Sequence, residues 1–483
     1  MKTNPTCFIL LILFSFTTSL SFSQMIWSKT FGGVNNDEGA VVRQTSDGGF
    51  IVSGVTDLLG NNVYNLWLIK TDAAGNEEWS KTYDLNAGDV RQTPDNGYIV
   101  ATSKFKPASG DYDVVLMKTN STGDTLWTKT YGGSGDEGAS RVLLTADGGY
   151  AITGTTRSFG AGNTDFMLIK TNSTGEMLWM ETYGGSYNDL CFEGQETADG
   201  GFILAGYKQM DAFENADFYL VKTDAGGNEQ WNKNFGGDQD DLAYSVAQTS
   251  DDGYILTGYT RSFGSGFYSL YLVKTDESGD SVWTKVYGGD VSDFGMSVIQ
   301  TPEDDFAISG LTQSYSEDGV PDIWLLKTDV YGDILWTDHL GGSSAEQGSF
   351  IDQTTSGDFI ITGFTYSYGA GESDLWLVRY ASDGPTGIEN REQSDGPAVE
   401  ILGNFPNPFS SATTITYAVR QSARVTMSIY DITQREVARI VNDHKLPGTY
   451  KTVFDGSRLE SGIYFCHLRT DNQEVVKKIV IAR

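Results

Sequence analysis

Short apolar runs, divided by glycine and by acidic or amide residues, fill the chain from about residue 25 to residue 380. Runs such as residues 49–54 and 66–71 are apolar on both faces, which is typical of strands buried between neighbouring sheets. No stretch shows a convincing apolar period of 3.6 residues. The pattern therefore predicts an all-β protein built from many short strands.

A turn motif closes each unit of this pattern: Asp or Asn, two residues, Gly, three residues, then Trp. Asp or Asn opens the turn by bonding its own backbone, and Gly adopts the positive φ that a hairpin bulge requires. The Trp then lies on the returning strand, where its apolar area can hold one unit against the next. The motif recurs at Asp72-Gly75-Trp79, Asn120-Gly123-Trp127, Asn172-Gly175-Trp179, Asp224-Gly227-Trp231, Asp276-Gly279-Trp283 and Asp329-Gly332-Trp336.

The tryptophans define an internal repeat. A seventh, Trp27, lacks the preceding turn, and successive Trp residues are 52, 48, 52, 52, 52 and 53 positions apart. Each interval holds four short strands separated by Gly- and Asp-rich turns. Four-stranded units of this length are typical of the blades of a β-propeller.

The two ends of the repeat region settle the number of blades. Seven sets of three strands begin near residues 41, 89, 141, 192, 243, 296 and 350, and six of them are followed by a Trp-bearing fourth strand. The last set ends at Tyr380 with no Trp after it. Residues 25–33, which carry Trp27, therefore supply the missing strand. We predict a seven-bladed propeller over residues 24–380, closed by its N-terminal strand so that no sheet edge stays open.

The Asp-x-x-Gly-x-x-x-Trp motif at the blade junctions is similar to the tryptophan-docking motif of pyrroloquinoline-quinone-type propellers. That resemblance implies the fold. Members of that family typically have eight blades, adjacent cysteines and a calcium-bound cofactor pocket, and this sequence shows none of the three. We therefore expect no quinone cofactor.

A second segment follows a linker. Residues 381–397 are rich in Gly, Pro, Ser and charge and have no apolar period, as in a linker. Residues 398–483 then contain six or seven alternating strands. Val425, Met427 and Ile429, for example, share one face of such a strand. This length and pattern predict a small immunoglobulin-like β-sandwich.

Residues 404–409 read Asn-Phe-Pro-Asn-Pro-Phe, and strands TTITYAV and VTMSIYD, Gly462-Ile463-Tyr464 and a terminal Lys-Lys-Ile follow. Together they resemble the type A C-terminal sorting domain of the type IX secretion system. The resemblance implies contact with that machinery, transit through the periplasm and the outer membrane of Bacteroidota-type bacteria, and removal of the domain at the surface. An ordinary terminal sandwich is the alternative. The motif residues are Asn404, Pro406, Asn407, Pro408 and Phe409.

Residues 1–23 have the features of a secretory signal peptide: Lys2, an apolar run over residues 8–16, and small residues at Ser21 and Ser23. An uncleaved membrane helix is the alternative, but the run is short for one. We expect a mature chain without a transmembrane segment, secreted or held at the outer-membrane surface. Only Cys191 and Cys466 would remain, which is too few for a disulfide framework.

The charge narrows the possible partners. The formal net charge is −31, and from Ala398 onward 11 basic and 8 acidic residues give +3, so the remainder carries −34. Such an acidic body argues against nucleic acid or an anionic membrane as a partner. Cations and basic proteins stay open, and we expect a monomer.

Catalytic motifs are scarce. Of the three histidines, His444 and His467 lie in the C-terminal segment, and His339 replaces a Thr on a repeated structural strand. Neither Cys-x-x-Cys nor His-Glu-x-x-His occurs, so the sequence contains neither of these zinc-binding motifs. We predict no catalytic residue and no cofactor.

One acidic position recurs after the Gly-Gly pair of most units. These carboxylates belong to the face that carries the loops before the first strand and after the second strand of each blade, here called the loop face. A carboxylate ring could bind Ca²⁺. The alternative is that each acid caps backbone N–H groups of its own loop. The acids are Asp37, Glu137, Asp189, Asp241, Asp293 and Glu346.

Aromatic residues and broken repeats supply the remaining candidates. An aromatic residue follows the second strand in four blades, at Phe159, Phe263, Tyr315 and Tyr368. These residues could form a platform for a sugar, or each could anchor its own loop. The second and fourth blades depart from the repeat, and loops that vary on a rigid scaffold often carry binding specificity. Sequence drift is the alternative there. The ligand candidates in these loops are Lys104, Phe105, Lys106 and Lys208.

Two classes of function follow. The first is a secreted or cell-surface propeller that binds a glycan, a protein or another envelope component. The second is a secreted polysaccharide-active hydrolase or lyase that uses carboxylates and tyrosines of the loop face. The missing catalytic motif favours binding.

Overall fold

The structure is a computed structural model, and it describes residues 24–61, 63–210, 215–316, 318–385, 399–405, 407, 409–419, 423–433, 435–445, 448–470 and 473–482. The chain forms two compact units, Met1–Thr386 and Gly387–Arg483. The predicted signal peptide and most of the predicted linker lie outside the described residues. The boundaries of those two segments therefore stay predictions.

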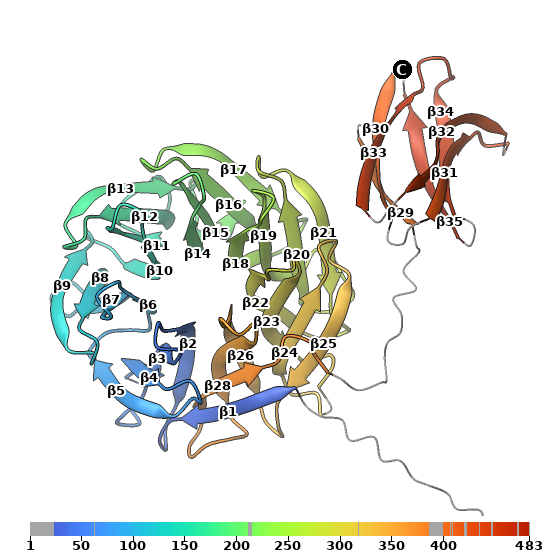
Figure 1. Cartoon of the computed structure of the whole chain (residues 1–483). Coiled ribbons are helices and arrows are strands. Elements are labelled where there is room, and N and C mark those ends of the chain that lie inside the picture. The colour runs from blue at the N-terminus through green and yellow to red at the C-terminus, as the bar shows by residue number, and fades with distance from the viewer. Residues whose placement is uncertain are drawn as a thin grey trace, which may run out of the picture. The chain divides into compact units, whose positions relative to one another are not determined.

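The first unit is a seven-bladed propeller of four-stranded antiparallel sheets arranged in a ring (Figure 1). Blades 1 to 6 each take four consecutive strands, starting with β2–β5, and blade 7 consists of β26, β27, β28 and β1. The inner strands are β2 (Asp37–Gln44), β6 (Asp89–Gln92), β10 (Glu137–Leu144), β14 (Asp189–Glu196), β18 (Asp241–Gln248), β22 (Asp293–Gln300) and β26 (Glu346–Gln353).

The next two strands of each blade are buried on both faces, as their apolar runs predict. The second strands are β3 (Phe50–Thr56), β7 (Tyr98–Lys106), β11 (Tyr150–Thr156), β15 (Phe202–Gln209), β19 (Tyr254–Thr260), β23 (Phe306–Thr312) and β27 (Phe359–Thr365). The third strands are β4 (Asn65–Thr71), β8 (Asp111–Thr119), β12 (Asp165–Thr171), β16 (Ala216–Thr223), β20 (Ser269–Thr275), β24 (Asp322–Thr328) and β28 (Asp374–Tyr380).

The outer strands carry the repeated tryptophans. They are β5 (Glu77–Tyr83), β9 (Thr125–Tyr131), β13 (Met177–Tyr183), β17 (Glu229–Phe235), β21 (Ser281–Tyr287), β25 (Ile334–Leu340) and β1 (Met25–Phe31). The N-terminal β1 pairs antiparallel with β28, with Met25 opposite Tyr380 and Phe31 opposite Leu375 (Figure 1). The predicted seven-bladed ring, closed by its N-terminal strand, is therefore confirmed.

Each tryptophan docks on the next blade around the ring. The ring of Trp79 lies 2.9 Å from the point where a Cβ on Gly123 would stand, and Gly123 has a φ of 81°. Trp79 also meets Tyr98, the first residue of the next second strand, edge to face at 5.8 Å between ring centroids. The glycine thus meets two separate demands, a left-handed backbone and room for an indole. The other docking pairs are Trp27–Gly75, Trp127–Gly175, Trp179–Gly227, Trp231–Gly279, Trp283–Gly332 and Trp336–Gly384.

An ion pair between a largely buried cation and a more exposed aspartate ties the turn before the second strand to the third strand in every blade. In blade 1 Lys70 Nζ lies 2.9 Å from an oxygen of Asp47 and donates to the carbonyl of Thr71. Bonds from Thr45, Lys70 and the Gly49 N–H lower the pKa of Asp47 to about 2 against the opposing effect of burial. The repeated Asp-Gly-Gly and Lys-Thr-Asp elements are therefore two halves of one contact. The same contact recurs in Lys118–Asp95, Lys170–Asp147, Lys222–Asp199 and Lys274–Asp251. In blades 6 and 7 the acid stands two positions later, at the place of Gly49, and the pairs are Lys327–Asp305 and Arg379–Asp358.

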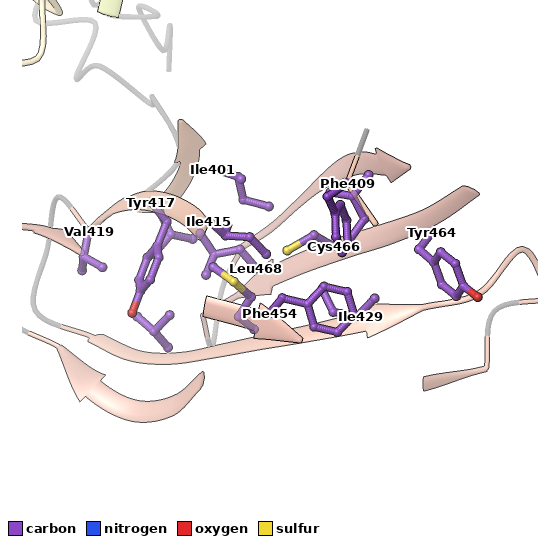
Figure 2. Packing of buried hydrophobic residues seen from close by; sticks show 14 of the residues in the cluster. Ile401, Phe409, Ile415, Tyr417, Val419, Ile429, Phe454, Tyr464, Cys466 and Leu468 are labelled. Carbon is purple, nitrogen blue, oxygen red and sulfur yellow. The ribbon is translucent and has the colours of Figure 1, made fainter. Parts of the chain in front are cut away.

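The second unit is a sandwich of two antiparallel sheets, β29-β30-β33 and β32-β31-β34-β35. Its strands are β29 (Val399–Phe405), β30 (Ala412–Val419), β31 (Ala423–Tyr430), β32 (Glu436–Lys445), β33 (Gly448–Asp455), β34 (Gly462–Arg469) and β35 (Glu474–Ile481). Figure 2 shows side chains of both sheets, including Ile415, Phe454 and Leu468, meeting in one core. Val425, Met427 and Ile429 lie in this core, as their spacing predicts. The described part of this unit contains seven strands, which agrees with the six or seven that the alternating pattern predicts.

The docking contact predicts a difference between two glycine substitutions. Gly123 and Gly148 share a φ of 81°, but Gly148 has open space where a side chain would begin. Gly148→Ala should cost only the left-handed strain of an L-residue, about 1–2 kcal/mol. Gly123→Ala should cost a further ~1–3 kcal/mol because its methyl group displaces the Trp79 ring. Urea unfolding of the full chain measures both, and equal losses of stability would contradict the docking role.

Candidate functional site: the axial cavity

A cavity of about 280 Å³ lies on the propeller axis. All seven blades contribute to its wall. The lining residues are Glu38, Gly39, Ala40, Val55, Ala87, Arg141, Phe192, Tyr244, Met296 and Ser349. Because most of them belong to the first half of an inner strand, the cavity occupies the end of the channel nearest the loop face.

A β-bulge in the inner strands aims side chains at this cavity. In β18 the pairing with β19 shifts between Ala243 and Ser245, which leaves Tyr244 without a partner across the ladder. The same shift isolates Phe192 in β14 and Met296 in β22. A bulge redirects the side chain of its extra residue, and these three line the cavity.

The wall of the cavity is asymmetric. Blades 4 to 6 present Phe192, Tyr244 and Met296, whereas blades 7, 1 and 2 present Ser349, Ala40 and Ala87. The large side chains support one another, and the rings of Phe192 and Tyr244 have centroids 5.3 Å apart. Tyr207 and Tyr259 extend this aromatic wall behind them. Burial raises the pKa of Tyr244 to about 12, so its phenol stays protonated at neutral pH.

Arg141 supplies a cation to this cavity. Its Nε lies 2.9 Å and 3.0 Å from the two oxygens of Glu193 on the neighbouring blade. Its guanidinium carbon is 5.5 Å from the ring centre of Phe350, which belongs to blade 7. Blades 3 and 7 are separated by two others, so this contact spans the channel.

A second arginine extends the same network. Arg43 stacks on Phe350 at 4.9 Å and lies 3.6 Å from Asp89 of blade 2. Asp89 accepts the N–H of Val142, and Arg91 Nε donates to the carbonyl of the same residue at 2.6 Å. Burial raises the pKa of Glu193, partly offset by Arg141, and lowers the pKa of Arg91 to about 10. We call the set Arg43, Asp89, Arg91, Arg141, Glu193 and Phe350 the channel network.

Sequence reasoning missed the axial cavity and the channel network. It looked for residues that recur in every unit or for loops that depart from the repeat. The network instead occupies two positions of the inner strand at which the blades differ: Arg141 in β10 is Ser245 in β18 and Phe350 in β26. The sequence does contain one signal for the channel network: charged residues stand at inner-strand positions that are apolar or small in other blades.

The six repeated acids cap their own loops. In each case a carboxylate oxygen accepts the N–H of the second glycine of the Gly-Gly pair, as in Asp37 with Gly33 at 2.7 Å and Glu346 with Gly342 at 3.0 Å. Several also accept a hydrogen bond from the Thr that ends the second strand or from the Ser two residues later, such as Glu137 from Thr156. In the part of the chain that the structure describes, no group of three or more His, Cys, Asp or Glu side chains is placed to hold a metal ion. Calcium binding by these acids stays a prediction.

A second carboxylate stands beside most of these acids. An acid among the first three residues of the third strand in one blade and the capping acid of the next blade both lie against the first glycine of the Gly-Gly pair. In one such pair, burial and then the charge of Asp241 raise the pKa of Asp217 to about 6. The other pairs are Asp374–Asp37, Asp113–Glu137, Asp165–Asp189 and Asp322–Glu346.

The four aromatic residues that follow second strands do not line the axial cavity. Phe263 packs on Tyr271, Tyr315 on Trp324, and Tyr368 on Trp376, each pair within its own blade. Phe159 approaches Gly133 in the same way. Each of the four is at least 39% exposed, so one face of each ring remains open. They anchor loops, and their role as a sugar platform stays a prediction.

The predicted lysines have partners nearby. Lys104 Nζ lies 3.0 Å from Asp84, and Lys106 Nζ lies 2.8 Å from Asp113. Lys208 stacks on the Tyr219 ring at 4.7 Å. Phe105 is 45% exposed and packs on Tyr112. Each of these four residues therefore has a contact within the propeller. A role in ligand binding stays a prediction.

His339 lies on the outer strand β25, opposite Trp324, as the repeat predicts. Cys191 and Cys466 are both free and buried, one in each unit. Burial raises the pKa of both thiols, which makes them poor nucleophiles. None of these three residues lines the axial cavity.

The sorting motif joins the first and last strands of the sandwich. Phe409 is buried in the core, and its N–H donates to the carbonyl of Val480 at 3.0 Å. The side chain of Asn407 accepts the N–H of Val480 at 2.9 Å. Only the backbone of Asn404 is described, and Pro406 and Pro408 lie outside the described residues. The motif thus fastens the β29–β30 connection to β35.

Comparison with known proteins identifies the second unit. Residues 404–482 match the family of secretion system C-terminal sorting domains. The chain is therefore a propeller that carries the sorting domain of the type IX secretion system, and a domain of this kind directs export to the cell surface or secretion. Among the described residues there is no helix with the length and apolarity required to cross a membrane.

Other likenesses are distant. Over 154 residues the chain is 28% identical to the regulatory protein FlaEY of Caulobacter vibrioides, which corresponds to 29% of this chain and 16% of that relative. PorZ, a surface component of the type IX secretion system of Porphyromonas gingivalis, is 12% identical with a TM-score of 0.43, over 94% of this chain and 60% of PorZ. The propeller domain of the Trilobed protease of Pyrococcus furiosus is 10% identical with a TM-score of 0.44, over 74% of this chain and all of that domain.

The Asp217–Asp241 pair predicts a pH effect on stability. Because the pKa of Asp217 is raised on folding, the folded state holds its proton more tightly, and stability falls as the pH rises from about 4 through 6. Asp217→Asn removes this titration. The variant should gain about 1–2 kcal/mol relative to the parent between pH 4 and pH 7, after allowance for partial exposure.

Chemical unfolding at both pH values measures this gain. Asp238→Asn, which changes an exposed acid of the adjoining loop, is the control and should leave the difference between the two pH values unchanged. The same pH dependence in the Asp217 variant and the parent would show that Asp217 ionises normally.

Proposed function

We propose that this exported propeller is a binding protein that holds part of an extracellular ligand in its axial cavity. The observation that supports the proposal is the asymmetric wall, in which Phe192, Tyr244 and Met296 face small residues across the axis. A cavity with an apolar wall and a few polar groups is the usual form of a ligand site. A glycan, a protein or another envelope component could supply the group that enters.

The dimensions and chemistry favour one ring or side chain of such a ligand. A cavity of about 280 Å³ is slightly smaller than the usual site for a small molecule. Its aromatic wall suits an apolar face, while Glu38 and Arg141 offer an acceptor and a donor. Most lining residues belong to strands, and sites built on strands are held more precisely than sites on loops.

The same residues favour binding over hydrolysis. Glycoside hydrolysis normally uses two carboxyl groups on either side of the scissile bond. Among the described residues that line the axial cavity, Glu38 is the one carboxylate. The nearby Glu193 is engaged by Arg141, and Tyr244, with a pKa of about 12, does not act as a base at neutral pH. The alternative of a polysaccharide-active hydrolase or lyase has weaker support from this site.

Filling the cavity tests the proposal. Saturation-transfer NMR of the full chain with a panel of monosaccharides and N-acetyl amino-acid amides should reveal ligands of the parent protein. Met296→Trp should abolish their signals because the indole occupies the cavity, with little change in melting midpoint. Met177→Trp, at a 51% exposed position on an outer strand, is the matched control.

Unchanged binding by Met296→Trp would rule out the axial cavity as the site. An assay for reducing ends released from polysaccharides should stay negative with the parent protein. A positive result would instead support the enzyme alternative.

The sorting domain predicts the fate of the exported chain. A variant that lacks residues 399–483 should accumulate in the periplasm, because the secretion machinery has nothing to engage. We expect the surface form of the parent to end within or near residues 381–397, as mass spectrometry would show. Normal export of the truncated variant would rule out the sorting role, and an intact Arg483 on most surface molecules would rule out processing.

A further inference from the structure

Blade 1 lacks a cover that other blades share. In blades 3, 5, 6 and 7 a Ser-aromatic pair follows the second strand. In blade 5, Ser262 and Phe263 pack against Gly237, the second glycine of the Gly-Gly pair, and Phe263 also covers Tyr271. The pair therefore closes the space between the Gly-Gly loop and the third strand. The corresponding pairs are Ser158-Phe159, Ser314-Tyr315 and Ser367-Tyr368.

Leu58 and Leu59 replace this pair in blade 1, within a loop of the same length. Both turn to solvent and are 58% and 81% exposed. Gly33, which corresponds to Gly237, has no atom within 4 Å of the point where a side chain would begin. Blade 1 therefore lacks the Ser-aromatic pair, and no other side chain of the described residues takes its place over Gly33.

The missing cover exposes a tryptophan. Trp67 stands opposite Gly54 on β4, at the position held by Trp324 in β24 and Trp376 in β28. Those two are 3% exposed beneath Tyr315 and Tyr368, whereas Trp67 is only half-buried. A cavity of about 760 Å³ opens beside it, here called the Trp67 cavity.

Polar groups surround the indole in this cavity. Asp37, Asp57 and Asn35 line it together with Lys81 and the hydroxyl residues of β5. Asp57 is particular to this blade, because Arg157 and Arg261 hold the same position in blades 3 and 5. Asn35 donates to the backbone carbonyl of Asp57 at 2.9 Å, which holds that wall in place.

We propose that the Trp67 cavity binds a neutral sugar of an extracellular glycan, independently of the axial cavity. The C–H face of a pyranose ring packs against an aromatic face, and its hydroxyl groups donate to carboxylate oxygens. A volume of about 760 Å³ lies within the usual range for ligand sites. Asp37 and Asp57 repel a carboxylate, and the one lysine in the lining, Lys81, is already paired with Asp124, so the cavity disfavours uronic and other acidic sugars.

A glycan array with the full chain tests this assignment. The parent should bind neutral glycans and not acidic ones. Trp67→Ala should weaken binding at least tenfold by calorimetry. Because that change also removes packing, a second variant restores the repeat: Leu58→Ser with Leu59→Phe should cover Trp67 and abolish binding at an unchanged melting midpoint.

Phe267→Ala, at a 69% exposed aromatic residue of another loop, is the control and should bind as the parent does. The proposal is overturned if the restored Ser-Phe variant binds normally, or if the array shows no neutral glycan. Loss of glycan binding in Met296→Trp but not in the Trp67 variants would move the sugar to the axial cavity and also overturn it. If Met296→Trp leaves ligand binding unchanged while the Trp67 variants lose it, only the proposal for the axial cavity is contradicted.

Discussion

The propeller depends on the contact of an indole ring with the α-carbon of a glycine in the next blade. Each tryptophan lies where the glycine side chain would be, so the two blades approach as closely as main chain permits. The same ring meets the first aromatic residue of the next second strand, as Trp231 meets Tyr254. One contact therefore sets the distance and the angle between neighbours. Seven copies of it, closed through Trp27, define the ring.

A scaffold held at its rim leaves its centre and its loops free to vary. The docking contacts and the ion pairs between the third strand and the turn before the second strand recur in every blade, and the loop-capping acids recur in six. The inner strands do not share this constraint beyond their apolar positions. Arg141, Phe192 and Tyr244 occupy inner-strand positions that are Ser or Ala in other blades. Chemistry particular to this chain therefore gathers on the axis and at blade 1, where Leu58 and Leu59 stand in place of the cover.

Much of the fold follows from the sequence because it is periodic. The tryptophan spacing and the unpaired strand around Trp27 predict seven blades and the closure, since both are properties of the repeat. The contacts on the axis could not be predicted in the same way. Arg141 reaches Phe350 across the channel, and no local pattern pairs blades 3 and 7. Strand β29 is hard to predict for a related reason, because its sequence Val-Glu-Ile-Leu-Gly-Asn-Phe does not keep the alternation of apolar and polar residues.

The Trp67 cavity follows from a position at which the repeat is broken. Four blades carry an aromatic residue after the second strand, and blade 1 does not. The informative observation was their replacement by Leu58-Leu59 in blade 1, because a repeated cover matters most where it is missing. Burial of Trp324 and Trp376 in the equivalent places makes the exposure of Trp67 interpretable.

Because β1 pairs with β28, the ring closes only when both ends of the propeller sequence are present. A chain that stops before Asp374 has no partner for β1, and the buried strand β27 of blade 7 keeps an open edge. Closing so long a loop adds little to the entropy cost, which grows only slowly with length. Since the sorting domain follows β28 in the chain, every molecule that carries the export signal already contains all the strands that closure requires. Export selection and structural integrity are thereby linked through the order of the polypeptide.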